Sequence, residues 1–220
     1  MTITVTDDDG AVGSDTLTVT VFNVAPTINT LSTSSSNPQF VLPGVHGVMF
    51  TADFTDPGWL DTHTASWDYG EGSIEAGTVV EENTPPDSTG DATGQHICSA
   101  PGLYTVTLTI TDDGATDTMT TTVNVVTVEE AVIDTNNYVQ TLPDDAFSKK
   151  AKNQKTTLDN KFSAVLEKLD ADEYMGAINQ LESIRKLVDG MGNDWITDPM
   201  AQLHLCMKID DIIAYLTMLL

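Results

Sequence analysis

Two periods of hydrophobic residues divide this chain. Up to about residue 125, Thr alternates with Val, Ile or Leu in short runs such as residues 2–6, 16–21 and 104–111. A period of two is typical of half-buried β-strands. From about residue 158 onward, apolar residues recur every three to four positions, which predicts amphipathic α-helices. The pattern therefore predicts an all-β part followed by an all-α part.

The β part contains an internal repeat. Residues 2–6 and 16–21 predict two strands joined by the acidic turn at residues 7–10, and residues 104–125 carry the same arrangement around a turn at residues 111–114. A hairpin unit that recurs along one chain indicates tandem all-β modules. We expect residues 1–25 to be the closing hairpin of a first module.

The second module, residues 26–126, is expected to be complete. Its predicted strands lie at 27–33, 46–55, 62–69, 75–81 and 94–98, followed by the hairpin 103–125. Residues 85–91 have no period and are expected to form a surface loop. Short alternating strands separated by Gly, Pro and Asp turns predict a two-sheet sandwich.

The helical part is expected to span residues 138–220, after a linker at 127–137 that has little pattern. Asp198 and Pro199 fit an N-cap and a first-turn proline, and Gly190 and Gly192 fit a helix end. Three apolar faces predict a small antiparallel three-helix bundle; they comprise Leu158, Phe162, Val165, Leu166 and Leu169, then Tyr174, Ala177, Ile178, Leu181, Ile184 and Val188, then Leu205, Ile209, Ile212, Ile213, Leu216 and Leu219.

Charge is distributed unevenly between the two parts. The first 148 residues hold 22 Asp and Glu but no Lys or Arg, so these carboxylates must rely on water, counterions or bound divalent cations. Such a surface argues against nucleic acid and anionic membranes as partners. The apolar run 209–220 is too short to span a bilayer, so no membrane insertion is expected. The start of the chain lacks the pattern of a signal peptide, and we expect a fragment of a longer protein.

Several motifs in order resemble the PKD domain. They are FTDPG at 54–58, DTHTA at 61–65, WDYGEGS at 67–73, GQH at 94–96, PGLYTVTL at 101–108 and TDDG at 111–114. The resemblance covers about residues 26–126, and it implies an immunoglobulin-like sandwich that serves as a spacer or interaction module in extracellular or cell-surface proteins. Glu71 stands where the family usually has Asp, and Cys98 lies near a position where a Tyr is common.

The C-terminal part, about residues 136–220, resembles the FIMAH domain, a short helical module of secreted bacterial and archaeal proteins. The resemblance implies architecture and location more than activity. It is carried by Phe147, residues 152–154, Leu158, residues 160–161, Tyr174, residues 177–178, Leu181, residues 189–190, residues 193–196 and residues 209–210.

Calcium is the candidate ligand of the acidic turns, because it takes six to eight oxygen ligands from carboxylates and carbonyls on loops. The candidate ligands are Asp56, Asp61, Asp68, Glu71, Asp112 and Asp113. None of the turns has the EF-hand pattern, and Asp-Gly is also what hairpin turns prefer. A solubilising acidic surface without any specific site therefore stays open as the alternative.

Catalysis is not expected. His46, His63, His96 and His204 lack metal-ligand spacing, and His63 and His96 are expected to be structural residues of the sandwich. Cys98 and Cys206 are expected to be unpaired and lie in no nucleophile motif.

Trp67 is expected in the core, whereas Trp59 and Tyr69 are candidate ligand contacts. Two functions remain. The first is a non-catalytic spacer and adhesion region, stiffened by calcium, that binds other surface proteins. The second is an accessory polysaccharide-binding region of a secreted hydrolase. Loss of retention on insoluble polysaccharide in Trp59→Ala would favour the second.

Overall fold

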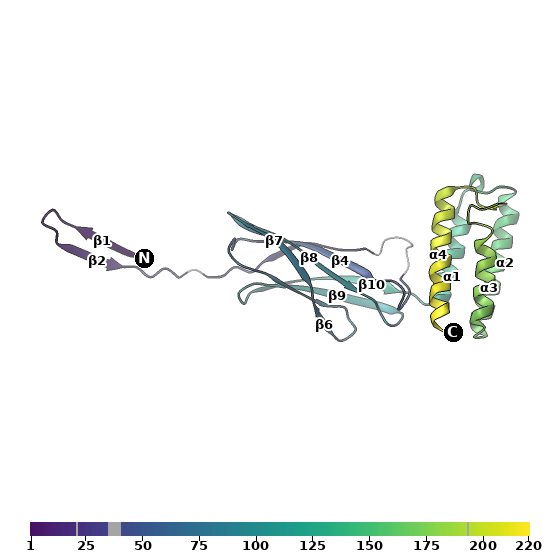
Figure 1. Cartoon of the computed structure of the whole chain (residues 1–220), viewed down its shortest axis with the longest axis horizontal. Helices are drawn as coiled ribbons and strands as arrows, with labels where there is room; N and C mark the ends of the chain where they lie inside the picture. Colours follow the sequence, from purple (N-terminus) through teal and green to yellow (C-terminus); the bar gives the residue numbers. More distant parts are fainter. Residues whose placement is uncertain (21, 35–40, 193) are drawn as a thin grey trace.

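The computed structural model describes residues 1–20, 22–34, 41–192 and 194–220. An N-terminal hairpin, a β-sandwich and a helical bundle follow one another along a single long axis (Figure 1). The predicted fold class, an all-β immunoglobulin-like sandwich followed by an all-α bundle, is confirmed.

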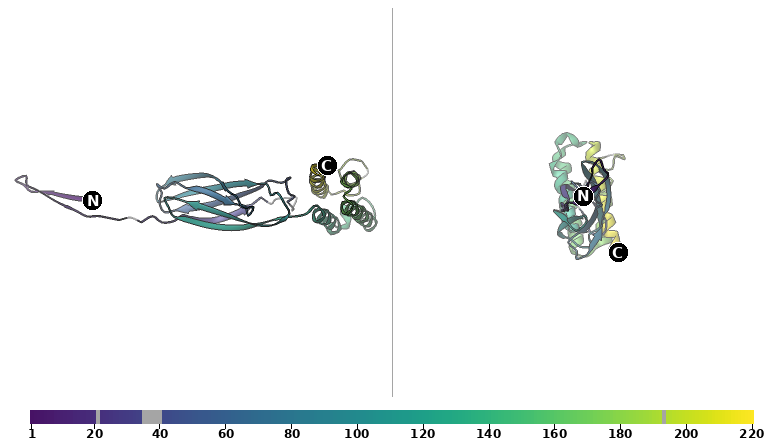
Figure 2. Two further views of the ribbon diagram at one scale, coloured as in Figure 1. Left: turned by 90° about the horizontal axis from the view of Figure 1, so that it is seen from below. Right: turned by 90° about the vertical axis from the view of Figure 1, so that its left-hand side faces the viewer.

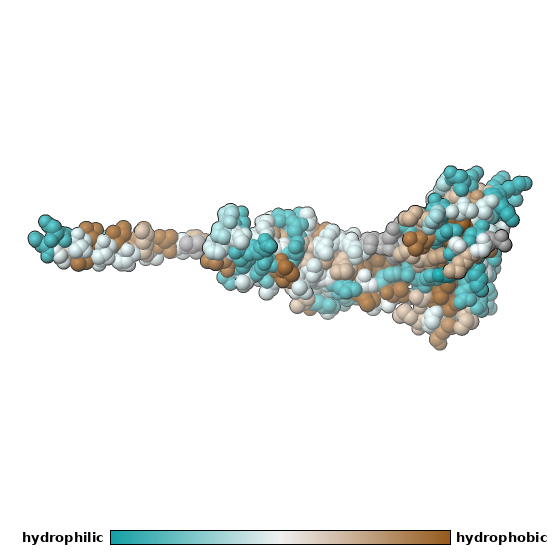
Figure 3. Space-filling model, turned by 45° about the horizontal axis from the view of Figure 1, so that its top comes forward, coloured by the Kyte–Doolittle hydropathy of each residue, from teal (hydrophilic) through white to brown (hydrophobic). Residues whose placement is uncertain are grey.

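The N-terminal hairpin pairs β1 (Thr2–Thr6) with β2 (Val12–Thr16). The prediction of a strand at 16–21 is wrong, and its last residue, Val21, lies outside the described residues. The reason is the length of the turn. Asp7 N donates to Ala11 O at 3.0 Å, so the second strand begins to pair with the first already at Val12. Leu17 is then opposite Met1, where the first strand has no further residues to pair with. Hydrophobic side chains remain exposed along this hairpin (Figure 3), among them Ile3 and Val5.

The sandwich consists of two four-stranded antiparallel sheets that lie face to face (Figure 2). One has the order β10-β9-β5-β6 and the other β3-β4-β8-β7. Their bounds are β3 Thr27–Thr33, β4 Val48–Asp56, β5 Thr64–Asp68, β6 Ile74–Ala76, β7 Thr78–Thr84, β8 Asp87–His96, β9 Gly102–Thr111 and β10 Thr116–Val125.

Residues 85–91 are not the loop that was predicted. Thr84 pairs with Asp87, so Pro85 and Pro86 alone form the turn, and β8 then runs from Asp87 to His96.

Gly94 lies within β8, although glycine is unfavourable in strands, because the packing around it leaves no room for a side chain. A Cβ there would lie 2.6 Å from Tyr69 Oη and 2.7 Å from Trp67 Nε1.

The sandwich core is built around Trp67, which is fully buried as predicted. Its neighbour Phe50 lies 5.5 Å away between ring centroids, and Tyr69 stacks parallel to it at 6.2 Å. Tyr69 in turn stacks on His96 at 4.3 Å. Tyr69 is only 2% exposed, so the prediction that it contacts a ligand is wrong: its ring is a core ring.

The described helical part holds four α-helices, not three. They are α1 (Val128–Thr141), α2 (Ala151–Asp170), α3 (Tyr174–Arg185) and α4 (Pro199–Met218), with a 3₁₀ turn η1 (Asp144–Ala146) between the first two. The predicted linker 127–137 is wrong, because α1 occupies it. Thr127 and Glu130 form a capping box that starts this helix. Asn193, one of the residues that carry the FIMAH resemblance, lies outside the described residues.

The helices cross the long axis of the molecule and enclose a core of their own (Figures 1 and 2). Fully buried Leu42, from the segment before β4, belongs to this helical core. Val126 N donates to Val41 O at 2.9 Å, and His46 Nε2 lies 3.1 Å from Asp211 Oδ2 on α4. The sandwich and the bundle are therefore joined by the buried side chain of Leu42 and by the half-buried His46–Asp211 pair. In the described ranges, no helix combines the length and hydrophobicity needed to cross a bilayer.

Candidate metal centre

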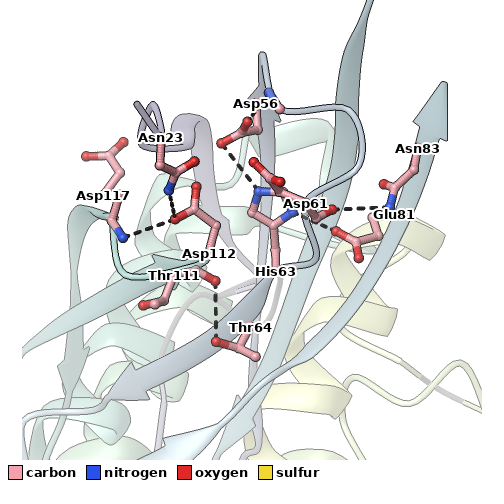
Figure 4. Close-up of polar contacts among 12 residues, drawn as sticks. Asn23, Asp56, Asp61, His63, Thr64, Glu81, Asn83, Thr111, Asp112 and Asp117 are labelled. Atoms are coloured by element: carbon pink, nitrogen blue, oxygen red, sulfur yellow. Dashed lines mark hydrogen bonds and ion pairs between the residues drawn. The ribbon is translucent and has the colours of Figure 1, made fainter. Parts of the chain in front are cut away.

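A polar cluster lies at the end of the sandwich nearest the N-terminal hairpin (Figure 4). Asp56 is the last residue of β4, His63 directly precedes β5, and Asp112 directly follows β9. Because β5 pairs with β9 through Thr64 and Thr111, the residues that flank this pair meet at one edge. One ligand atom from each of the three side chains lies within 4.8 Å of the others, and all three residues are buried.

Asp56 is fully buried, and only one of its two carboxylate oxygens accepts a hydrogen bond. Its Oδ1 accepts a hydrogen bond from Gly58 N, whereas its Oδ2 has no hydrogen-bond donor. A Cβ on Gly58 would lie 2.8 Å from Asp56 Oδ1 and would collide with the Asp61 carboxylate. The glycine therefore lets the loop fold tightly over the acidic group.

His63 lies between two carboxylates. Its Nδ1 is 2.7 Å from Glu81 Oε2 on β7, and its Nε2 is 3.5 Å from Asp56 Oδ2. Neither Nε2 nor Asp56 Oδ2 makes a hydrogen bond, although both are buried. The ring packs against Phe54 at 4.8 Å, which fixes its orientation.

Asp112 also offers one free oxygen. Its Oδ1 accepts from Asn23 Nδ2 at 2.8 Å and from Ala115 N at 3.1 Å, while its buried Oδ2 accepts from no group. Asn23 belongs to the connector between the hairpin and the sandwich. The cluster is thus in direct contact with that connector.

Ser88 is a further polar residue without a partner in this region. It is fully buried, its Oγ makes no hydrogen bond, and it pairs directly with Asp56 across β4 and β8. Directly paired residues of antiparallel strands point to the same face. In the described part of the chain, six buried side-chain N or O atoms lack a hydrogen bond, and four of them belong to Asp56, His63, Ser88 and Asp112.

This concentration of unsatisfied polar atoms is suited to a cation. A buried carboxylate oxygen without a donor costs free energy, and a divalent ion bound between two such oxygens removes that cost. Half-buried Asp61 is a further acidic residue near these groups. Its pKa is raised above the usual 3.8, first by desolvation and then by repulsion from the negative charges of Asp56, Asp113 and Asp112. No Lys or Arg before residue 149 competes for these groups. The residues present therefore fit a divalent cation.

The six predicted calcium ligands do not form one site. Asp56, Asp61, Asp112 and Asp113 lie together at this end, whereas Asp68 is the last residue of β5, at its opposite end, and Glu71 lies in the turn that follows. Asp68 Oδ1 accepts from Gly70 N at 2.8 Å and shapes a turn. Glu71 is already satisfied, since Oε2 lies 2.6 Å from His96 Nε2 and Oε1 accepts from Ser99 N and Oγ at 2.9 and 2.8 Å.

Ser99, Glu71 and His96 do not form a catalytic triad. Both the serine hydroxyl and the imidazole bind the same carboxylate, so the hydroxyl does not face the histidine. A serine nucleophile requires a direct hydrogen bond to its base. The group instead holds the turn after β5 against the segment after β8.

These contacts make the stability of the sandwich depend on pH. The backbone hydrogen bond from Ser99, and then the side chain of His96, lower the pKa of Glu71 from 4.5 to about 2. A lowered folded-state pKa stabilises the fold above pH 4.5, and this contribution is lost as the pH falls from 4.5 towards 2. We expect Glu71→Gln to lower the melting temperature at pH 7, and this difference to shrink below pH 4.5.

The measurement is thermal unfolding of both proteins from pH 7 to pH 2. Glu82 lies exposed on neighbouring β7, and Glu82→Gln serves as the matched control that follows wild type throughout. A constant difference between wild type and Glu71→Gln at every pH would contradict the expectation.

Trp59 lines a pocket of about 440 Å³ beside the candidate metal centre. Phe22 and Val24 of the connector form one wall, and residues 57–61 form the other, with Asp113 nearby. The Trp59 side chain is 37% exposed and is accessible to a ligand, unlike that of Tyr69.

His63 is the residue of the centre that was expected to be merely structural. Its partners Asp56 and Glu81 lie on β4 and β7, and Asp112 directly follows β9, so no local spacing brings them together. The feature that points to its role is its position: His63 lies one residue before β5, at the end of the β5–β9 pair where the acidic turn after β9 begins.

The sequence model of the PKD domain family matches residues 23–128. Among solved structures, the solution structure of the PKD domain from the human VPS10 domain-containing receptor SorCS2 is similar at 16% identity and a TM-score of 0.31, covering 50% of this chain and 82% of that chain. No curated protein matches the chain. The family match, which spans the sandwich from Asn23 to the start of α1, supports a PKD domain at residues 23–128.

Proposed function

We propose that this chain is a non-catalytic spacer and interaction region of an extracellular or cell-surface protein, and that a bound divalent cation fixes the N-terminal end of its sandwich. The match to the PKD domain supports the spacer role, since PKD domains are typically non-catalytic modules of extracellular proteins. The helical part, with its resemblance to the FIMAH domain, would anchor the chain or pair with another surface protein.

The observation that carries the cation is the pair of buried, donor-free oxygens, Asp56 Oδ2 and Asp112 Oδ2. Asp112 also binds Asn23 of the connector, so an ion at this place would hold the connector against the sandwich. Calcium is the ion expected from the oxygen-rich surroundings, with Asp61 and water completing its coordination.

Thermal unfolding in chelator and in millimolar calcium tests this function. An ion that binds only the folded state raises stability by mass action, by about 2.7 kcal/mol at a concentration of 100 Kd. We expect a higher melting temperature in calcium, loss of this shift in Asp56→Asn, and retention of it in Asp68→Asn, the matched control at the opposite end of β5. If calcium does not raise the melting temperature of the wild-type protein, the calcium site is refuted.

A second function, polysaccharide binding, is favoured by the pocket beside Trp59. Its aromatic and acidic lining suits the faces and hydroxyls of a sugar. Retention on insoluble polysaccharide that is lost in Trp59→Ala would support it, and a wild-type protein that is not retained would exclude it for the polysaccharide used.

A further inference from the structure

We infer that the ion this centre binds most tightly is zinc, held by Asp56 Oδ2, His63 Nε2 and Asp112 Oδ2. This inference rests on the cation site of the proposed function and names the class of metal. It differs from the calcium expectation because a nitrogen ligand is placed among the oxygens.

The first argument is the orientation of His63. Glu81 is a hydrogen-bond acceptor, so the 2.7 Å contact places a proton on Nδ1, and Nε2 is the nitrogen that faces the centre and can bind a metal. That nitrogen is buried and has no hydrogen bond. A carboxylate on the far nitrogen is the arrangement that orients histidine ligands in zinc sites.

The second argument is spacing. Zinc binds N and O ligands at about 2.0–2.1 Å in a tetrahedron, which places ligand atoms about 3.3–3.4 Å apart. The distance between His63 Nε2 and Asp56 Oδ2 is 3.5 Å, close to that value. One ligand atom from each of the three side chains lies within 4.8 Å of the others, so a small inward shift of the Asp112 side chain completes the set.

The third argument is the number of oxygens on offer. Gly58 N binds Asp56 Oδ1, while Ala115 N and Asn23 bind Asp112 Oδ1, so each carboxylate presents one oxygen to the centre. Two single oxygens and one nitrogen are few for calcium, which takes six to eight oxygens. They match a zinc site with three protein ligands, and Ser88 Oγ or a water can take the fourth position. Two carboxylates also balance the charge of Zn²⁺.

The test is metal titration of the whole 220-residue chain, followed by thermal unfolding. We expect zinc to raise the melting temperature at a concentration at least tenfold lower than calcium requires. His63→Gln should remove the zinc response, and Glu81→Gln should weaken zinc binding by about 10–100-fold, as for loss of an outer partner. His96→Gln, which changes the other sandwich histidine at the far end, is the matched control and keeps the response.

A spectroscopic readout on wild type avoids reliance on variants that fold poorly. Cobalt(II) should give visible absorption of a tetrahedral N/O site without the thiolate charge-transfer band that Cys98 or Cys206 would produce. Imidazole nitrogen NMR should show Nε2 of His63 shifting on addition of zinc.

The outcomes separate the two proposals. Stabilisation by calcium alone, unaffected by His63→Gln, would overturn the zinc inference and leave the proposed function standing. Equal stabilisation by zinc of wild type and His63→Gln would also overturn it. A melting temperature that responds to neither ion would refute the cation site itself, and the zinc inference with it.

Discussion

Trp67→Ala is expected to lower the free energy of unfolding of the sandwich by about 3–5 kcal/mol, the usual cost of truncating a large buried aromatic residue. Trp67 has no exposed surface and contacts Phe50 and Tyr69, so its removal leaves a cavity between the two sheets. The rings of Phe50 and Tyr69 pack against each other at 5.4 Å, and Tyr69 also stacks on His96, so neither ring fills that space without leaving these contacts.

Urea unfolding followed by tryptophan fluorescence and by β-sheet circular dichroism measures this change. Trp59→Ala is the matched control, because Trp59 lies in a loop and is 37% exposed; we expect a change within about 0.5 kcal/mol. Similar losses for the two substitutions would show that Trp67 is not the centre of the core.

Leu42→Ala is expected to destabilise the helical bundle by about 2–5 kcal/mol, although Leu42 precedes β4 of the sandwich. The side chain is fully buried in the core formed by the helices, so its truncation opens a cavity there. A residue outside the bundle in sequence thus contributes to the stability of the bundle.

Helical circular dichroism at about 222 nm during urea unfolding reports the bundle, where helix dominates the signal. Leu60→Ala, at a loop leucine that is 70% exposed, serves as the control and should leave this transition unchanged. An unaltered helical transition in Leu42→Ala would contradict the shared packing.

Much of the fold follows from local pattern. An indole at the end of an alternating strand predicts the burial of Trp67, and the β9–β10 hairpin follows from its Thr and Val alternation around an Asp-Gly turn. Helix α1 was missed because its buried face, Val128, Ala131, Val132, Thr135 and Val139, contains small and polar residues and gives weak contrast. Its capping box at Thr127 and Glu130 was the available signal.

The candidate site was predicted less completely than the fold. Asp56, Asp61, Asp112 and Asp113 could be selected because acidic turns next to strands are visible in the sequence. Asp68 and Glu71 lie at the opposite end of the sandwich because β5 runs away from the cluster. Glu71 is hydrogen-bonded to His96 and Ser99, which come from a distant segment of the chain. The role of His63 depends on contacts with β4, β7 and the end of β9, which only the pairing of the sheets establishes.

The two ends of the sandwich are supported unequally, and this has a mechanical consequence. Towards the bundle, buried Leu42 and the His46–Asp211 pair form a broad joint, whereas the connector to the hairpin is tied to the sandwich by the side chain of Asn23. Thermal bending concentrates at the less supported joint. An ion bound beside Asn23 would therefore act on the angle between the hairpin and the sandwich as well as on the stability of the fold, and its local concentration would set how widely the N-terminal hairpin sweeps.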